Sequence, residues 1–328
     1  MERKEVDIIV IGGGAAGLAA AIEAKENGID SILILERNED LGGILPQCIH
    51  TGFGLHYFKE NLTGPEYITR FVKKVKDSGI EYKTDTMAFD LNSKGGVGKE
   101  VLAANQTDGL LKLQAKAVIL AMGCREKSRG ALCIPGARPA GIFTAGTAQR
   151  LMDIDGYVPG KKVLILGSGD VGLIMARRFA MEGAEVKGVV EIMPFPGGLD
   201  RNLQCLTDFG IPIYLSHEAT FIHGDERVEA VTIMERGENE SSVAGSEKRI
   251  ECDTLILSVG LIPENELSKK AFIELDSKTG GPLINEYMEA SIDGIFACGN
   301  VVYVHDLVDQ VTAEGERAGY CASKYARG

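Results

Sequence analysis

Tryptophan is absent from this sequence of 328 residues, and so is any apolar run of the length that crosses a membrane. The uncharged run Ile8–Ile22 has 15 residues, four of them glycine. A transmembrane helix needs about 20 predominantly apolar residues. The same run lacks the basic flank and the cleavage site of a secretory signal peptide. We therefore expect a cytoplasmic protein without a transmembrane segment.

Cysteine pairs of the C-x-x-C type are also absent. The seven cysteines are irregularly spaced, and their odd number argues against a framework of disulfides. Neither a zinc ribbon nor a thioredoxin-like dithiol can be formed from neighbouring cysteines. The five histidines include no H-x-x-x-H pair, so we expect no bound metal ion. The cysteines are Cys48, Cys124, Cys133, Cys205, Cys252, Cys298 and Cys321.

Positive charge is scarce as well. Lysine and arginine total 35 against 47 aspartates and glutamates, which gives a net charge of -12 with histidine neutral. Because no basic cluster offsets this balance, we expect no nucleic-acid partner and no anionic membrane partner.

Glycine is abundant, with 41 residues, and the N-terminus concentrates several of them in one pattern. A β-rich apolar run, Val6–Ile11, leads directly into the glycine loop Gly12–Gly17. A helical stretch, Leu18–Asn27, follows the loop, and the second strand, Ser31–Leu35, ends at Glu36. This order of strand, turn, helix and strand predicts a βαβ unit.

The same pattern returns in the middle of the chain. The predicted strand Lys162–Leu166 is followed by the glycine loop Gly167–Gly172 and the predicted helix Leu173–Glu182. The next predicted strand, Glu185–Val190, ends at Glu191. An internal repeat of this size predicts two similar domains.

Spacing strengthens the match between the two copies. Each acidic residue stands 24 positions after the first glycine of its loop. Each is also followed, six and seven positions later, by a Gly-Gly pair, which the sequence alone does not distinguish from chance. These pairs are Gly42-Gly43 and Gly197-Gly198.

Each loop has the form G-x-G-x-x-G, which binds the pyrophosphate of a dinucleotide. The first glycine allows the tight turn, the second lets the phosphate approach the backbone, and the third lets helix and strand pack closely. The acidic residue accepts hydrogen bonds from the adenosine ribose. In the second copy, Glu191 favours the free 2′-hydroxyl of NAD and repels the 2′-phosphate of NADP. No arginine follows it until Arg201, so we expect NAD(H) there, with NADP disfavoured.

Two further apolar runs, Ala117–Gly123 and Thr254–Gly260, precede and follow the second copy. We interpret them as the places where the chain leaves and re-enters the first domain. The predicted fold is α/β, with two Rossmann-like three-layer domains, the second inserted into the first. The predicted limits are 1–122 and 253–328 for the first domain and 123–252 for the inserted NAD(H)-binding domain.

In order along the chain, these motifs resemble the pyridine nucleotide–disulfide oxidoreductase superfamily, and in layout its low-molecular-weight thioredoxin reductase branch. The resemblance covers nearly the whole chain and identifies the first dinucleotide as FAD. It rests on Gly12–Gly17 with Glu36, Ala121–Gly123, Gly167–Gly172 with Glu191, Gly260–Pro263, Gly294–Asn300 and Gln310–Thr312.

The resemblance also implies contact residues. Backbone N–H groups of Gln310–Thr312 are expected to point at the flavin pyrimidine edge. The expected FAD contacts are Gly12, Gly14, Ala15, Ala16, Gly17, Glu36, Arg37, Gly43, Gln47, Cys48, Thr86, Ala121, Gly123, Gly299, Asn300, Gln310, Val311 and Thr312. The expected NAD contacts are Gly167, Gly169, Asp170, Val171, Gly172, Glu191 and Gly260.

The sequence departs from the family where the family carries its redox dithiol. The stretch Phe143–Gln149, which corresponds to the thioredoxin reductase C-x-x-C, contains no cysteine. The stretch Gly43–His50, which corresponds to the dithiol of the larger disulfide reductases, contains one cysteine. Asn300 and Met122 replace the family's aspartate and threonine. We therefore expect no dithiol relay.

The segment Leu41–Phe58 and the stretch Gly136–Gln149 resemble a smaller group of flavoproteins. These are the subunits that accompany anaerobic glycerol-3-phosphate dehydrogenases and the α-type subunits of dye-linked amine and amino-acid dehydrogenases. The resemblance implies a partner dehydrogenase subunit or a small iron–sulfur protein, or both. Association of the chain with itself as a homo-oligomer is left open.

These observations favour an oxidoreductase that passes a hydride between NAD(H) and FAD as the electron-transfer subunit of a larger dehydrogenase. Two alternatives remain: a free-standing NADH oxidase or peroxidase that uses Cys48, and an assembly chain whose FAD is structural. Cys48 fits either a redox thiol at the flavin or a small buried hydrophobe. His50 fits either a proton donor to the flavin or a polar loop residue. Cys124 and Cys298 are interpreted as packing residues.

Overall fold

The computed structural model describes residues 2–92, 98–237, 239 and 241–328. The chain divides into two compact units, the first made of Met1–Arg125 and Ile262–Gly328 and the second of Glu126–Leu261. The two segments that connect the units, β9 (Cys124–Glu126) and β18 (Leu261–Pro263), pair with each other. The second unit is therefore an insertion in the first.

The first unit is built on a sheet of order β5-β2-β1-β8-β7-β6, in which β19 also pairs with β8. β1, β2, β5, β8 and β19 are parallel, whereas β6 and β7 form an antiparallel meander with β8. The strands are β1 (Glu2–Ile11), β2 (Ile32–Leu35), β5 (Glu81–Lys83), β6 (Met87–Asn92), β7 (Lys99–Asn105), β8 (Gly109–Leu120) and β19 (Ile295–Ala297).

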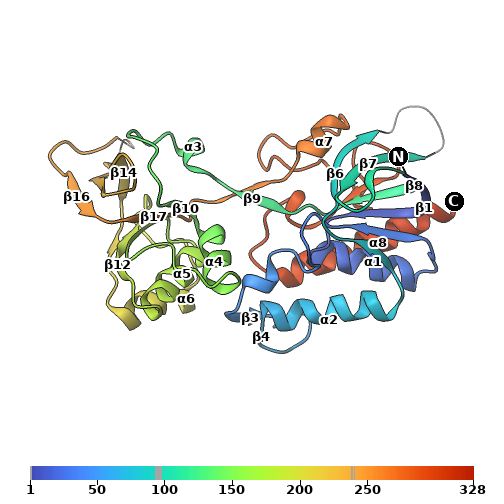
Figure 1. Cartoon of the computed structure of the whole chain (residues 1–328), viewed down its shortest axis with the longest axis horizontal. Helices are drawn as coiled ribbons and strands as arrows, with labels where there is room; N and C mark the ends of the chain where they lie inside the picture. Colours follow the sequence, from blue (N-terminus) through green and yellow to red (C-terminus); the bar gives the residue numbers. More distant parts are fainter. Residues whose placement is uncertain (1, 93–97, 238, 240) are drawn as a thin grey trace. The chain divides into compact units, whose positions relative to one another are not determined.

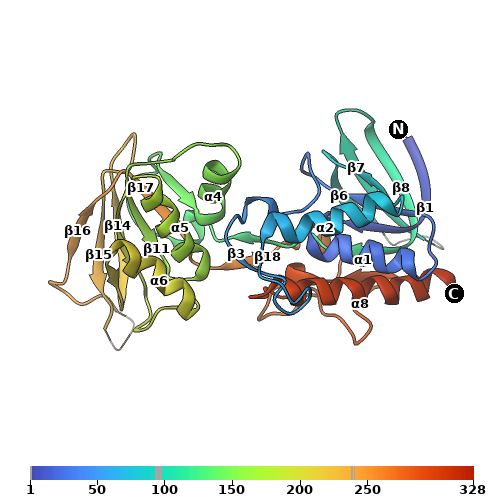
Figure 2. The ribbon, with the colours of Figure 1, turned by 90° about the horizontal axis from the view of Figure 1, so that it is seen from below.

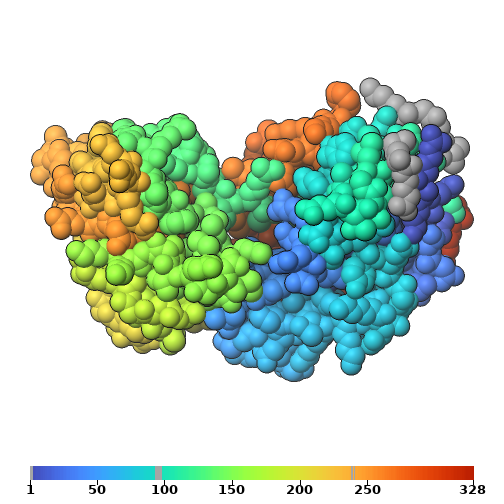
Figure 3. All heavy atoms as spheres, in the orientation of Figure 1, coloured from blue at the N-terminus to red at the C-terminus, as the bar shows by residue number. Residues whose placement is uncertain are grey.

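Three helices, α1 (Ala15–Glu26), α2 (Gly64–Asp77) and α8 (Val308–Arg327), pack together on one face of this sheet (Figures 1 and 2). α1 contacts both α2 and α8. α2 begins with a capping box between Thr63 and Glu66, which satisfies two backbone donors at the helix start. The space-filling view shows α2 at the surface of this unit (Figure 3).

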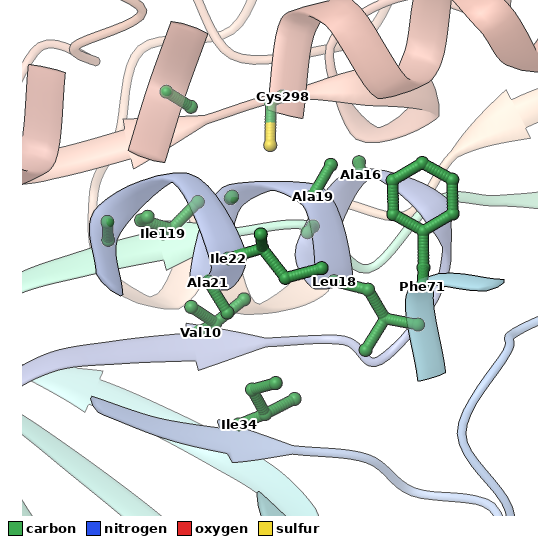
Figure 4. Close-up of a cluster of buried hydrophobic side chains, with 14 of the residues drawn as sticks. Val10, Ala16, Leu18, Ala19, Ala21, Ile22, Ile34, Phe71, Ile119 and Cys298 are labelled. Atoms are coloured by element: carbon green, nitrogen blue, oxygen red, sulfur yellow. The ribbon is translucent and has the colours of Figure 1, made fainter. Parts of the chain in front are cut away.

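Successive side chains of a central strand point to opposite faces of the sheet, and both faces are buried. In β1, Ile8 and Val10 belong to the core under the helices, whereas Ile9 and Ile11 belong to the core on the opposite face. A strand that is buried on both faces must be apolar at every position. Figure 4 shows Val10 and the helical side chains Leu18 and Ile22 in the core under the helices.

The opposite face of the first sheet is covered by the meander and by α7 (Glu266–Lys270). Leu91 of β6, Val101 of β7 and Leu113 of β8 are buried there with Leu267 of α7. The first unit therefore has three layers: helices, a mainly parallel sheet, and the meander with its short helix.

The second unit repeats this arrangement. Its parallel sheet has the order β10-β17-β11-β12-β13, and two separate buried clusters cover its two faces. One cluster joins the sheet to helices and the other joins it to an antiparallel sheet. The parallel strands are β10 (Ile142–Thr144), β11 (Lys162–Leu166), β12 (Glu185–Val190), β13 (Ile213–Tyr214) and β17 (Thr254–Leu257). The covering elements are α4 (Ala145–Asp153), α5 (Asp170–Met181), α6 (Asp200–Phe209), β14 (His217–His223), β15 (Ala230–Glu235) and β16 (Lys248–Glu251).

The predicted α/β class, with two Rossmann-like three-layer domains, is confirmed. The second boundary differs from the expected limit of 252/253, because the unit extends to Leu261. β17 lies between β10 and β11 in the second sheet, and its four residues are buried. The run Thr254–Gly260 therefore begins with a strand of the inserted unit, Thr254–Leu257, and only the residues after that strand lead to the connection. Among the described residues, no helix is long and apolar enough to span a membrane.

Candidate dinucleotide-binding sites

The first glycine loop lies between β1 and α1, where two of its glycines are required by packing. Gly12 has a φ of +110°, and a Cβ there would lie 2.3 Å from the Ala121 carbonyl oxygen. A Cβ on Gly17 would lie 1.9 Å from the Gly12 carbonyl oxygen. Both distances are far inside van der Waals contact with backbone atoms that cannot move independently.

Gly14, the middle glycine, is different. It is the N-cap of α1 with a φ of -85° and a ψ of -169°, which any residue adopts. A Cβ there would first meet the Gly43 Cα at 3.7 Å, an ordinary contact. Neither strain nor packing within the protein explains glycine at this position. An anion lying directly against the backbone at the helix N-terminus does explain it.

Glu36 follows β2 and is 4% exposed. Its Oε2 accepts a hydrogen bond from the Gly13 N–H at 2.7 Å, and its Oε1 accepts one from the Asn38 N–H at 2.8 Å. These bonds hold the carboxylate against the glycine loop. Each carboxylate oxygen has a second lone pair, so each can accept a further hydrogen bond from a ribose hydroxyl.

The second loop reproduces this geometry. Gly167 has a φ of +92°, and a Cβ there would lie 2.0 Å from the Ser258 carbonyl oxygen. A Cβ on Gly172 would lie 2.7 Å from the Gly167 carbonyl oxygen. Gly169 is the N-cap of α5 with a φ of -63°, and its Cβ would meet nothing closer than the Ser258 Oγ at 3.9 Å. In this loop too, packing within the protein does not explain why the middle position is a glycine.

Glu191 is held as Glu36 is, and it is 7% exposed. Its Oε2 accepts from the Ser168 N–H at 2.9 Å and from the Ser168 hydroxyl at 2.6 Å, and its Oε1 accepts from the Met193 N–H at 2.9 Å. The Ser168 Oγ also accepts from the Gly197 N–H at 2.8 Å. Sequence reasoning missed Ser168, because a serine between two glycines carries no distinguishing pattern.

The trailing Gly-Gly pairs have structural roles in both units. The Gly42 N–H donates to the Gly13 carbonyl oxygen at 2.8 Å, and a Cβ on Gly43 would lie 3.0 Å from the Gly14 Cα. Gly197 bonds Ser168, the counterpart of Gly13. The sequence left open whether these pairs were chance, and the structure places each of them against its own glycine loop.

Of the other expected NAD contacts, Asp170 and Val171 belong to the second loop itself, and Gly260 follows β17. The carboxylate of Asp170, the first residue of α5, accepts from the Leu199 N–H at 2.8 Å and from the Asn202 amide at 2.6 Å, so it binds the start of α6. Val171 is exposed, and Gly260 has a φ of +104°.

Near the first loop, Ala121 continues from β8, and its N–H donates to the Ile11 carbonyl oxygen at 2.9 Å. Arg37 is exposed next to Glu36. Thr86 is 1% exposed; its N–H donates to the Glu36 carbonyl oxygen and its hydroxyl to the Thr84 carbonyl oxygen. Thr86 therefore borders the Glu36 region through its backbone, while its side chain is bonded within the protein.

The C-terminal end of β19 leads into the short helix η2 (Gly299–Val301). The Asn300 Oδ1 accepts from the His305 N–H at 3.0 Å, and the Asn300 amide points at the Cys124 sulfur at 3.7 Å. Gly123, just before Cys124, has a φ of +72°. Cys298 is fully buried and its sulfur points toward α1 (Figure 4), and burial raises the pKa of its thiol.

α8 begins at Val308, so the expected backbone donors Gln310–Thr312 lie in its first two turns. In an α-helix the first few N–H groups have no intrahelical partner. Gln310 and Val311 N–H both approach the Leu307 carbonyl oxygen, at 3.2 and 3.5 Å. Thr312 lies more than one turn inside the helix and is fully buried; its hydroxyl is 2.7 Å from the Tyr67 hydroxyl.

The loop that carries Cys48 packs against the start of α2. Cys48 is half-buried, and its thiol donates to the Ile44 carbonyl oxygen at 3.5 Å. Gln47 is 7% exposed at the end of the short helix η1 (Leu45–Gln47). The His50 Nδ1 lies 3.1 Å from the Thr51 carbonyl oxygen, and the ring lies 5.1 Å from that of Phe53.

The family model for Pyridine nucleotide-disulphide oxidoreductase matches residues 6–317 of this sequence. The chain belongs to this family. Members of the family use FAD and NAD(P)H, and the chain is accordingly an oxidoreductase with these cofactors. The two open middle glycines, each beside a held carboxylate, fit the two dinucleotides.

The curated relatives of this chain differ in length. Thioredoxin reductase from Mycolicibacterium smegmatis is 26% identical and covers 94% of this chain and 92% of its own length. The small chain of glutamate synthase (NADPH) from Escherichia coli (strain K12) is 29% identical, with 95% of this chain matched to 66% of that protein. An opine oxidase subunit from Agrobacterium tumefaciens (strain Ach5) is 23% identical, with 90% matched to 61%. The chain thus spans less than two thirds of these last two proteins.

Solved structures show the same fold. The thioredoxin reductase of T. acidophilum superimposes with a TM-score of 0.79 at 24% identity and is covered to 99%, as is this chain. The L-proline dehydrogenase of P. horikoshii has a TM-score of 0.70 at 22% identity, with 97% of this chain matched to 55% of that chain.

Proposed function

We propose that the chain passes a hydride between NAD(H), bound by the second unit, and FAD, bound by the first. We further propose that it does so as the electron-transfer subunit of a multisubunit dehydrogenase of the glycerol-3-phosphate or amino-acid type. The observation that carries the first part is the pair of matched loops. In each, packing explains the outer glycines and leaves the middle one facing a ligand.

FAD, when bound, supplies the redox chemistry by exchanging a hydride with NAD(H) and electrons with a second redox partner. The protein contributes binding and orientation. The N-termini of α1 and α5 offer N–H groups and a partial positive charge to the two pyrophosphates. Glu36 and Glu191 fix the two adenosine riboses.

Glu191 also sets the preference between NADH and NADPH. A buried carboxylate bonded to Ser168 accepts ribose hydroxyls but repels a 2′-phosphate. We expect Glu191→Gln to weaken NADH binding about tenfold, since a charge-assisted hydrogen bond becomes a neutral one. The ratio of NADH to NADPH affinities should fall by more than that, because the repulsion disappears. Titration of both nucleotides by calorimetry measures the ratio.

Glu36→Gln is the matched control for that measurement. Glu36 is held by the same kind of backbone bonds in the first unit. The substitution should weaken FAD binding and leave the ratio of NADH to NADPH affinities unchanged. An unchanged ratio in Glu191→Gln would remove the assignment of NAD to the second unit.

We propose a partner because the electrons of the reduced flavin need an acceptor outside this chain. The structure assigns none of the seven cysteines to a disulfide, and the segment at the start of α4 contains no cysteine. Two relatives are named as parts of larger enzymes, the small chain of glutamate synthase and the opine oxidase subunit. A flavin without a dithiol requires another electron acceptor or donor, and a second chain with its own flavin or iron–sulfur cluster supplies one.

Isolation from the native cell under non-denaturing conditions tests the proposed assembly. We expect a second chain to copurify with this one and to add a further flavin or iron–sulfur spectrum. The assembly should oxidise glycerol 3-phosphate or an amino acid, which the separated chain should not do. The proposal of a larger assembly fails if the chain purifies alone and turns over NADH with a natural small acceptor at its full rate.

A further inference from the structure

Ser168, the second residue of the second glycine loop, is fully buried and joins this loop to Glu191 and Gly197. Its hydroxyl donates to the Glu191 Oε2 at 2.6 Å and accepts from the Gly197 N–H at 2.8 Å. Its backbone N–H donates to the same Glu191 Oε2 at 2.9 Å. One residue therefore provides two donors to a single carboxylate oxygen.

The two oxygens of the Glu191 carboxylate consequently differ in what they can still accept. A carboxylate oxygen has two lone pairs, and Ser168 occupies both of them on Oε2. The Oε1 accepts from the N–H of Met193, an exposed residue, at 2.9 Å. Among the residues that the structure describes, no other group donates to this carboxylate. Glu191 thus retains one acceptor site, on Oε1.

The bond from Gly197 fixes the direction of the Ser168 hydroxyl. A hydroxyl has one hydrogen to donate and two lone pairs. Because the Gly197 N–H donates to the Ser168 Oγ, the hydrogen of the hydroxyl is directed to the Glu191 Oε2. The Oε2 therefore stays occupied when a ligand binds beside it.

Glu36 in the first unit keeps one acceptor site on each oxygen. Among the described residues, only the Gly13 N–H donates to its Oε2 and only the Asn38 N–H to its Oε1. The cause is glycine in place of serine, since Gly13 has no hydroxyl. A Cβ on Gly13 would lie 2.7 Å from the Leu41 Cδ2, so a serine there would displace the Leu41 side chain. The two loops therefore prepare their carboxylates differently.

We propose that Ser168 restricts Glu191 to one hydroxyl of the adenosine ribose, the 2′-hydroxyl of NAD(H), and leaves the 3′-hydroxyl without a bond to this carboxylate. An acidic residue at this place in the fold hydrogen-bonds the 2′-hydroxyl of NAD, so the one free site belongs to that group. Glu36, with two free sites, accepts both hydroxyls of the FAD adenosine. Ser168 is a positioning residue that acts through Glu191. The inference rests on the proposed binding of NAD(H) by the second unit and of FAD by the first.

The first test changes the ligand and needs no variant. The wild-type chain with oxidised FAD bound is titrated with NAD⁺ and with two analogues, which lack the 2′- or the 3′-hydroxyl of the adenosine ribose. We expect loss of the 2′-hydroxyl to weaken binding about tenfold, because a hydrogen bond to a charged group is lost. Loss of the 3′-hydroxyl should leave the affinity unchanged.

The second test removes the Ser168 hydroxyl. Ser168→Ala frees one acceptor site on the Glu191 Oε2, and the 3′-hydroxyl can then donate to it. We expect this variant to bind the 3′-deoxy analogue about tenfold more weakly than NAD⁺. Loosening of the loop alone would instead weaken the binding of NAD⁺ and both analogues by the same factor.

Ser242→Ala is the matched control in the same unit. The Ser242 hydroxyl also donates to a glutamate, the Glu218 Oε1, at 2.7 Å. This pair lies at the exposed hairpin that precedes β16 and has no bond to the glycine loop. The control should therefore show the wild-type ratios of affinity for NAD⁺ and the two analogues.

The first unit provides a comparison within the same chain. Wild-type apoprotein is titrated with FAD and with FAD analogues that lack the 2′- or the 3′-hydroxyl of the adenosine ribose. Both analogues should bind about tenfold more weakly than FAD, since Glu36 has a site for each hydroxyl. Indifference of FAD binding to the 3′-hydroxyl would overturn the contrast between the two carboxylates.

Equal losses of NAD⁺ affinity from removing either hydroxyl in the wild type overturn the inference, and so does full affinity for the 2′-deoxy analogue. Wild-type ratios in a folded Ser168→Ala variant overturn the role of Ser168. Each of these results, obtained with a chain that binds NAD⁺, leaves the proposed function intact. Failure of the wild-type chain to bind NAD⁺ or NADH at all is the separate result that removes the proposed function and this inference with it.

Discussion

Gly14→Ala is expected to abolish FAD binding while leaving the first unit folded. Alanine fits the backbone angles and has room, since the nearest atom to its Cβ is 3.7 Å away. In the proposed site, the added methyl group instead occupies the place of the pyrophosphate at the helix N-terminus. Loss of charge-assisted hydrogen bonds to phosphate should weaken FAD binding by about 100-fold or more. The measurement is the flavin content and FAD affinity of the purified variant.

Stability measurements separate this effect from misfolding. An alanine in place of an N-cap glycine changes the free energy of unfolding of the apoprotein by only about 1 kcal/mol. Gly17→Ala should destabilise it by about 3 kcal/mol, because its Cβ would lie 1.9 Å from the Gly12 carbonyl oxygen. If the folded Gly14→Ala variant bound FAD as tightly as wild type, the first loop would not be the pyrophosphate site.

Gly169→Ala is expected to leave the flavin in place and to stop NADH from reducing it efficiently. The Cβ would again meet only an ordinary contact, 3.9 Å from the Ser258 Oγ. We expect the second-order rate constant for reduction of the flavin by NADH to fall by about 100-fold, for the reason given for Gly14. Anaerobic stopped-flow absorption at several NADH concentrations measures it.

Gly130→Ala is the matched control in the same unit. Gly130 lies in the short helix α3 (Arg129–Leu132), and its Cβ would lie 3.6 Å from the Ser128 Oγ. This variant should be reduced at the wild-type rate. A Gly169→Ala variant that NADH reduces as fast as the control would contradict the placement of the nicotinamide dinucleotide in the second unit.

The glycine loops and their acids could be predicted because their chemistry is local in sequence. A tight turn needs positive φ at Gly12 and Gly167, and these requirements recur at fixed spacing. The two-sided burial of the end of β1 also follows from the four consecutive apolar residues Ile8–Ile11. The same local signal misplaced the second boundary, since an apolar run such as Thr254–Leu257 looks alike whether it ends one domain or begins another.

Features that depend on distant contacts could not be read in advance. Asp309 bonds a backbone N–H that is 253 positions away, at His56. An acidic residue near a helix start is ordinary, so no pattern separates it from a capping residue. Ser168 was missed for a similar reason, because its role appears only where Gly197 folds back onto it.

Reduction of the bound flavin by NADH tests the central claim most directly. The purified FAD-loaded chain is mixed anaerobically with one equivalent of NADH, and the visible absorption of oxidised flavin is followed with time. Hydride passage between the two cofactors predicts rapid bleaching of that band, with NADH consumed in equal amount. A flavin that stays oxidised while NADH is demonstrably bound would contradict the account and leave FAD as a structural ligand.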